Sequence, residues 1–307
     1  MPNWITIRVK ADNPKVFKEK FLVAYTEEEI KEEKHINDWG EELPSRVDFH
    51  LLIPTPADLQ IRSGGGSYKN ENNYYGFEKE GVQAQKSLIT PLLKQTYKEE
   101  LTQEEYINVT LPLAMGTYRN RFMEVYGISN SLQGDRIEEE IRVVLQGFYN
   151  FEKYGAVDWY DYQIKKWGTK WNADTIYVDE ERGFAEFRTA WSCPFEILEE
   201  LAKYTDIAVS YADEDIGNNF GVYTIKNGIT EKIVESDKWD SLNGRQKISA
   251  IATSIALTEG EVYELNEQLF NDEDEQAYGV DKQTALQIGQ KTVEEISKVL
   301  SELNLYS

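Results

Sequence analysis

The sequence is poor in the residues that build metal and redox sites. Cys193 is the only cysteine, and His35 and His50 are the only histidines among 307 residues. A single cysteine excludes an intramolecular disulfide and a cysteine-based zinc site. Two histidines without spaced cysteines or carboxylates are a weak metal signal, and we interpret both as structural. We expect no cofactor.

Long apolar runs are also missing. No stretch approaches the roughly 20 consecutive apolar residues that a membrane-spanning helix needs. The first residues, MPNWITIRVK, contain no apolar signal core. Together with the scarcity of cysteine, this pattern predicts a soluble protein of a reducing, cytoplasmic compartment.

Basic residues are strongly outnumbered. The chain has 33 Lys and Arg against 55 Asp and Glu, which gives a formal net charge of −22. Such a charge opposes direct binding to nucleic acid or to an anionic membrane, because both are bound through dense basic patches. It suits a basic partner, including the DNA-binding face of another protein. Solubility alone is the favoured explanation of the excess charge.

Apolar residues make up 40% of the chain and aromatic residues 12%, enough for a folded core. Alternation of apolar and polar residues, or short β-rich runs, predicts seven strands. Asn227-Gly228 separates the last two and is the typical sequence of a tight hairpin turn. The expected strands cover residues 4–9, 47–53, 175–178, 184–189, 207–211, 220–225 and 229–234.

Helices are expected between these strands. Pro14 after Asn13, and Pro194 after Ser192, are typical of helix starts. Thr102 with Glu105 predicts a capping box. An amphipathic stripe indicates a further helix, and its members are Ile137, Ile141, Val144, Leu145 and Phe148. A helix ending near Trp167, with Gly168 as its stop, and two C-terminal helices at 239–256 and 281–305 complete the pattern.

This order predicts an α+β fold with a split β-α-β arrangement. We expect residues 1–61 and 151–234 to form the α+β core. Residues 62–150 are expected to form a helical insertion, and residues 235–307 an acidic helical extension.

Five separate pieces of the sequence resemble one family. They are MPNW (1–4), DFHLLIPTPADL (48–59), WGTKWNA (167–173), FRTAWSCP (187–194) and YADEDIG (211–217). Their order and spacing are similar to those of the YubB-type, or Api-like, ferredoxin-like proteins of phages and conjugative plasmids. The resemblance covers about half the chain. The chain departs from this family at two residues. Members often have Cys where this chain has Ile5, and Pro where this chain has Cys193.

The resemblance implies a ferredoxin-like antiparallel sheet with packed helices, and an origin in a mobile genetic element of a bacterial host. It supplies no catalytic residue, because the family has no established activity. The term ferredoxin-like describes chain topology only, since one cysteine cannot hold an iron–sulfur cluster.

Candidate binding residues gather in two places. The first is an aromatic-rich region whose members are Trp159, Trp167, Lys170, Trp171 and Trp191. It is either a recognition surface, because Trp dominates interface hot spots, or structural core, which is the favoured interpretation. The second is the acidic run Asp272, Glu273, Asp274 and Glu275. It is either a mimic of the nucleic-acid backbone or a solvated face.

Three carboxylates, Asp213, Glu214 and Asp215, follow a strand and are a weak candidate for Mg²⁺ or Ca²⁺. A solvated turn is the favoured interpretation.

Three hypotheses follow. The first is a binding protein, not an enzyme, that inhibits a host defence or nucleic-acid-handling protein by occupying its surface. The second is a metal-dependent hydrolase that uses Asp213, Glu214 and Asp215. The third is a homo-oligomeric assembly protein that associates through the stripe from Leu286 to Leu303, which could equally be core.

Overall fold

The computed structural model describes residues 3–37, 40–61, 101–116, 119–120, 134–214, 220–235, 294 and 296–305. The chain divides into two compact units. Met1–Pro54 and Lys166–Ser307 form the sheet unit, and Thr55–Lys165 form the helical unit. The insertion expected at residues 62–150 lies inside the helical unit, which also includes residues 55–61 and 151–165.

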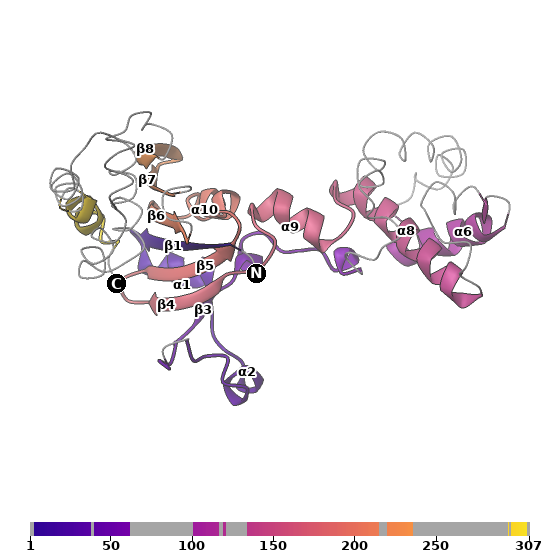
Figure 1. Ribbon diagram of the computed structural model, residues 1–307, viewed down its shortest axis with the longest axis horizontal. Helices are drawn as coiled ribbons and strands as arrows, with labels where there is room; N and C mark the ends of the chain where they lie inside the picture. The colour runs from indigo at the N-terminus through magenta and orange to yellow at the C-terminus, as the bar shows by residue number, and fades with distance from the viewer. Residues whose placement is uncertain are drawn as a thin grey trace, which may run out of the picture. The chain divides into compact units, whose positions relative to one another are not determined.

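A six-stranded sheet, antiparallel throughout, is the centre of the sheet unit (Figure 1). The strand order is β4-β5-β1-β6-β7-β8. The strands are β1 (Trp4–Ala11), β4 (Asp174–Asp179), β5 (Phe184–Ala190), β6 (Ile207–Asp213), β7 (Phe220–Lys226) and β8 (Ile229–Glu235).

The connections define a ferredoxin-like fold. Helix α1 (Pro14–Phe21) follows β1, and helix α10 (Phe195–Leu201) connects β5 to β6. β1 lies between β5 and β6, so α10 connects two strands that are not neighbours. After α1 the chain next enters this sheet at β4, which is separated from β1 by β5. This is the split β-α-β arrangement that the order of elements predicts, with β7 and β8 added at one edge. The predicted α+β, ferredoxin-like class is confirmed.

One face of the sheet forms the main core. Ile5, Ile7 and Val9 alternate along β1 and are fully buried against both helices. Phe17 and Phe21 of α1 fill the same core at a spacing of one helical turn.

The start of α1 also follows the prediction. The side chain of Asn13 accepts a hydrogen bond from the backbone N–H of Val16 at 3.2 Å, and Pro14 occupies the first helical position. The cap and the proline together fix where the helix begins, since the first N–H groups of a helix have no internal acceptor.

The opposite face of the sheet is covered at β6 and β7 by the end of the chain. Residues 296–302 are helical. Ile296, Leu300 and Leu305 are buried against Phe220 and Val222 of β7. The described part of the expected 281–305 helix therefore contributes core, whereas the rest of it and the expected 239–256 helix lie outside the described residues.

One expected strand is wrong. Of residues 47–53, only Val47 is in a strand, the two-residue β3 (Arg46–Val47), which pairs with β2 (Leu22–Val23) and precedes a 3-10 helix η1 (Phe49–Leu51). The carboxylate of Asp48 accepts the backbone N–H of His50 at 3.0 Å and caps that turn. Val47 and Phe49 are buried as alternate residues of a strand would be. The Asp48 side chain nevertheless caps a turn at this point, and the chain forms a 3-10 helix instead of a strand.

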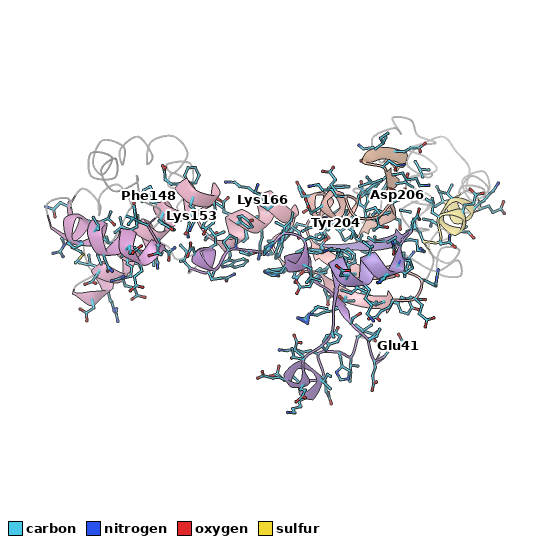
Figure 2. The ribbon with its side chains drawn as sticks, turned by 180° about the vertical axis from the view of Figure 1, so that it is seen from behind. Glu41, Phe148, Lys153, Lys166, Tyr204 and Asp206 are labelled. Atoms are coloured by element: carbon cyan, nitrogen blue, oxygen red, sulfur yellow. The ribbon has the colours of Figure 1, made fainter. Side chains whose placement is uncertain are left out.

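The helical unit contains η2 (Ala57–Leu59), α6 (Gln103–Met115), α8 (Asp135–Tyr154) and most of α9 (Trp159–Trp167). The predicted capping box of Thr102 and Glu105 begins α6. The predicted stripe from Ile137 to Phe148 is buried and packs on α6, which confirms the amphipathic assignment. Phe148 and Lys153 mark α8 in Figure 2.

A polar network ties this unit together. Asn150 is fully buried, and its side-chain NH2 donates to the backbone oxygens of Asp58 and Val157, each at 2.9 Å. Its side-chain oxygen accepts from Gln103 at 2.9 Å. The network therefore joins η2, α6 and α8, which lie far apart in the sequence.

Candidate functional site

Aromatic and basic side chains gather at the end of the sheet where β1 begins and β5 ends. Trp4 pairs across the sheet with Ala190, and Arg188 lies two residues earlier on β5. Lys170 and Trp171 stand in the loop that leads from α9 to β4. Together with Trp191, directly after β5, the residues Trp4, Lys170, Trp171 and Arg188 form what we call the tryptophan surface.

Two indole rings form its centre. The ring centroids of Trp4 and Trp171 are 6.2 Å apart, with a 39° angle between their planes. The ammonium group of Lys170 lies 3.7 Å from the Trp171 centroid, and the guanidinium carbon of Arg188 lies 5.6 Å from the Trp4 centroid. Each contact of this kind is worth about 0.5–1 kcal/mol where solvent is near. They restrain rings that would otherwise be mobile.

Arg188 is itself held in place. Its Nε and Nη2 atoms donate to one oxygen of Asp174 at 3.0 and 2.6 Å. A guanidinium bound through two nitrogens has a defined plane. Arg188 therefore presents a fixed cation beside Trp4.

Trp191 has an unusual backbone. Its φ is +73°, the left-handed region, and its side chain is 56% exposed. This conformation costs a residue with a bulky side chain about 1–2 kcal/mol relative to the right-handed region. The fold therefore includes this conformational cost although the indole ring of Trp191 is exposed to solvent.

Hydrogen bonds on both sides impose the conformation. The backbone N–H of Trp191 donates to the Asn3 oxygen at 2.8 Å. The hydroxyl of Thr169 donates to the oxygen of the preceding residue, Ala190, at 2.9 Å, and that of Ser192 donates to the Gly168 oxygen. These bonds fix the chain before and after Trp191, so the surroundings determine where the ring lies.

Trp167 has the structural role that the sequence left open. It is fully buried, its Nε1–H donates to the Ile53 oxygen at 2.8 Å, and its ring meets Phe49 edge-on at 5.6 Å. Gly168 then ends α9 with φ +76°, and a Cβ there would collide with the Glu196 carboxylate. Trp167 anchors the loop that carries Lys170 and Trp171.

Asp48 and His50 form a polar pair beside Trp167. Burial acts to raise the pKa of Asp48, but hydrogen bonds from the His50 ring, the Asn172 amide and the His50 backbone N–H lower it to about 2. The His50 Nδ1 atom lies 3.0 Å from the Asp48 carboxylate, and the His50 ring meets Trp167 edge-on at 4.8 Å. Asn172 also accepts the Phe49 N–H at 3.0 Å, so this pair secures the same loop.

The remaining candidates lie elsewhere. Trp159 belongs to the helical unit, where it is half-buried beside Tyr160. The acidic run 272–275 lies outside the described residues. Asp213 is nearly buried and accepts the Asn3 amide at 2.6 Å, whereas Glu214 is exposed.

Asp215 also lies outside the described residues, so the three-carboxylate site stays a prediction. Where the structure describes the chain, no group of three or more His, Cys, Asp or Glu side chains could hold a metal ion.

Sequence reasoning missed Trp4 and Arg188 as members of the site. A signal was present: Trp4 lies on the polar side of the β1 alternation, opposite Ile5 and Ile7. A large aromatic residue on the polar side of a strand often contacts something other than the core. The pairing with Arg188 depends on the sheet register, which is a tertiary feature.

The group offers binding chemistry. It presents aromatic faces and fixed cations, and rigid aromatic residues are the typical anchors of protein interfaces. None of its five side chains is a nucleophile paired with a base, which nucleophilic catalysis requires.

Residues 166–253 match the model of a protein family described as a ferredoxin-like domain in Api92-like protein. The matched stretch begins at the end of α9 and contains β4 to β8 and α10, which include every residue of the tryptophan surface except Trp4. Over this stretch the chain is similar to Api92-like proteins. No curated protein and no solved structure matches the chain. Among the described residues, no helix is long and apolar enough to cross a membrane.

Proposed function

We propose that this chain is a binding protein that docks onto another protein through the tryptophan surface. The observation that carries the proposal is Trp191, an exposed ring held in a strained backbone conformation. Strain of this kind persists at sites where the position of the side chain matters for function. Exposed Trp171, at 40%, supplies a second anchor in the same part of the sheet unit.

The charge of the chain supports a protein partner. Single-stranded nucleic acid also stacks on aromatic rings, but its binding requires a basic groove. A net charge of −22 opposes that mode. It favours instead a partner with a basic surface, which the chain as a whole would attract over distance, while Lys170 and Arg188 make the tryptophan surface itself locally basic. Proteins that handle nucleic acid carry such surfaces, so a host defence or nucleic-acid-handling protein fits this chemistry.

The resemblance to phage and plasmid proteins supports a mobile-element origin, in which such a binder would inhibit its target by covering a functional surface. The proposed setting is the cytoplasm of a bacterial host. The hydrolase hypothesis stays a prediction, and no observation in the described residues favours it over binding.

The test is affinity capture from host lysate with three forms of the full chain: wild type, Trp191→Gly and Tyr204→Ala. Tyr204 is the matched control, because it is 50% exposed and lies at the other end of the sheet, between α10 and β6 (Figure 2). We expect wild type and Tyr204→Ala to retain one stoichiometric partner and Trp191→Gly to lose it by tenfold or more.

Folding cannot explain that loss, because glycine tolerates φ +73° without strain. We expect Trp191→Gly to be about 1 kcal/mol more stable than Trp191→Ala in urea unfolding. Equal recovery of the partner by wild type and Trp191→Gly would count against the proposal. So would tight binding of a single-stranded oligonucleotide by the wild type.

A further inference from the structure

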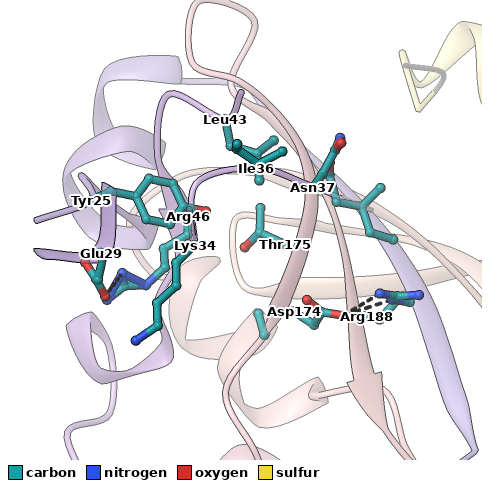
Figure 3. A pocket seen from close by; sticks show the side chains of 12 residues that line it. Tyr25, Glu29, Lys34, Ile36, Asn37, Leu43, Arg46, Asp174, Thr175 and Arg188 are labelled. Atoms are coloured by element: carbon teal, nitrogen blue, oxygen red, sulfur yellow. Dashed lines mark hydrogen bonds and ion pairs between the residues drawn. The ribbon is translucent and has the colours of Figure 1, made fainter. Parts of the chain in front are cut away.

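A small cavity lies between β4 and the segment that connects α1 to β3. It has a volume of about 190 Å³. Figure 3 shows Tyr25, Glu29 and Arg46 on one side, Asp174 and Arg188 on the other, and Thr175 between them. This volume is below the range of about 300–1,000 Å³ that is typical of drug-sized ligands, so the cavity suits a small chemical group.

The charges around the cavity differ from those of the whole chain. Three cations line it, Lys34, Arg46 and Arg188, against two carboxylates, Glu29 and Asp174. The lining side chains therefore sum to one positive charge in a chain whose net charge is −22, and Glu32, which pairs with Lys34, is not part of the lining. A locally positive cavity in an acidic protein selects anions over the far more numerous cations that such a protein attracts.

Both carboxylates are already engaged. One oxygen of Glu29 lies 3.0 Å from Nη1 of Arg46, and the other accepts the Thr26 backbone N–H at 2.8 Å. That capping bond from Thr26, more than any other contact, lowers the pKa of Glu29, although burial opposes it. Asp174 is bound by Arg188 through two nitrogens. These pairs hold both guanidinium groups in place before any ligand arrives.

Lys34 is bound differently. Its ammonium group lies 2.6 Å from a carboxylate oxygen of Glu32, and both side chains are more than half exposed. An exposed pair of this kind contributes little and exchanges easily with solvent. Lys34 can therefore turn toward an anion in the cavity at little cost.

The remaining lining is mixed, with polar Asn37 and Thr175 beside apolar Ile36, Leu43 and Ile176. Ile36 and Leu43 border the cavity beside the Tyr25 ring, over which Arg46 lies at 5.5 Å. From the fixed cations and this apolar wall, we infer that the cavity binds a carboxylate carried on a short apolar body. An inorganic phosphate would fill the charged part and leave the apolar part without contacts. This site goes beyond the proposed function and does not depend on it.

The test is a titration of the full chain with butyrate, followed through the NMR signal of the Arg46 Nε–H group. We expect a saturable shift. Butyramide and butylammonium, which keep the apolar body but change the charge, should give none at the same concentrations. Lys34→Gln should weaken butyrate binding about tenfold, because it removes one charge-assisted contact. Lys31→Gln, an exposed lysine of the same segment that does not line the cavity, is the matched control.

Two sources could supply such a carboxylate: a free short-chain acid, or a glutamate side chain of another protein. N-acetyl-glutamate amide, titrated alongside, separates them, since tighter binding than butyrate indicates the side chain and weaker binding the free acid. Equal binding of butyramide, equal affinity of Lys34→Gln and Lys31→Gln, or binding of inorganic phosphate without butyrate would overturn the inference. Trp191→Gly should bind butyrate with the affinity of the wild type. A failure of butyrate binding can therefore be distinguished from a failure of partner binding through the tryptophan surface.

Discussion

Asp48 shows how one side chain replaces an expected strand with a turn. Its carboxylate accepts bonds from the His50 backbone, the His50 ring and Asn172. The same carboxylate therefore caps η1 and holds the loop that carries the tryptophan surface. Removing it should affect both the stability of the sheet unit and its dependence on pH.

We expect Asp48→Asn to lower the free energy of unfolding by about 1 kcal/mol at pH 7, a value reduced from the full shift because the site is partly open to solvent. The folded pKa of about 2 lies below the unfolded value of 3.8. The carboxylate therefore stabilises the fold fully above about pH 4, and this contribution is lost as the pH falls toward 2.

Urea unfolding of wild type and Asp48→Asn at pH 7, 5, 4 and 3 measures this effect. The difference between the two should be constant down to about pH 4 and then shrink. Glu181→Gln, at an exposed position, is the control and should show no comparable difference. A difference that stays constant to pH 3 would contradict the assigned hydrogen bonds.

At the scale of elements, the β7–β8 hairpin is the clearest agreement between sequence and structure. Asn227 and Gly228 have φ of +50° and +73°, the left-handed pair that a tight hairpin turn requires. A Cβ at Gly228 would meet nothing within 4 Å. Any cost of replacing this glycine therefore comes from the backbone and not from a collision.

We expect Gly228→Ala to destabilise the chain by about 1 kcal/mol, because alanine disfavours positive φ. Asn227→Gly, one residue earlier, should be neutral or slightly stabilising. Thermal unfolding of the two variants beside wild type tests this. A Gly228→Ala variant as stable as wild type would show that the turn relaxes to another type.

At the scale of the whole molecule, two units with separate cores should unfold separately. The partners of the Asn150 side chain, Asp58, Val157 and Gln103, all lie in the helical unit. Asn150→Ala leaves these buried groups unpaired, which costs about 2–3 kcal/mol. Only the helical unit should lose that stability.

Hydrogen exchange on wild type and Asn150→Ala can separate the two units. Amides of α6 and α8 should exchange faster in the variant, whereas amides of β1, β5 and β6 should be unchanged. Uniform acceleration across both units would instead show that the chain unfolds as one cooperative body.

Features whose deciding contacts lie close along the chain could be predicted from the sequence. Caps at Asn13 and Thr102, the stripe of α8, the Asn227-Gly228 turn and the end of α9 at Gly168 are local, because the deciding contacts lie within a few residues. The split β-α-β arrangement also followed from the order of elements, since few topologies suit such a chain, whereas the strand order itself comes from the structure. At Asp48 a side-chain cap competes with the apolar alternation of residues 47–53, and the alternation alone gave a wrong strand prediction.

Which aromatic residues are core and which are surface depends on the folded arrangement of distant segments. Trp167 and Trp171 stand four residues apart in one motif, yet one is fully buried and the other is 40% exposed. The meeting of Trp4 with Trp171 and Arg188 depends on sheet register. The strain at Trp191 depends on the bond from its N–H to the Asn3 backbone oxygen and on the bond from Thr169 to the Ala190 oxygen. These contacts join residues far apart in the sequence, and no spacing along the chain encodes them.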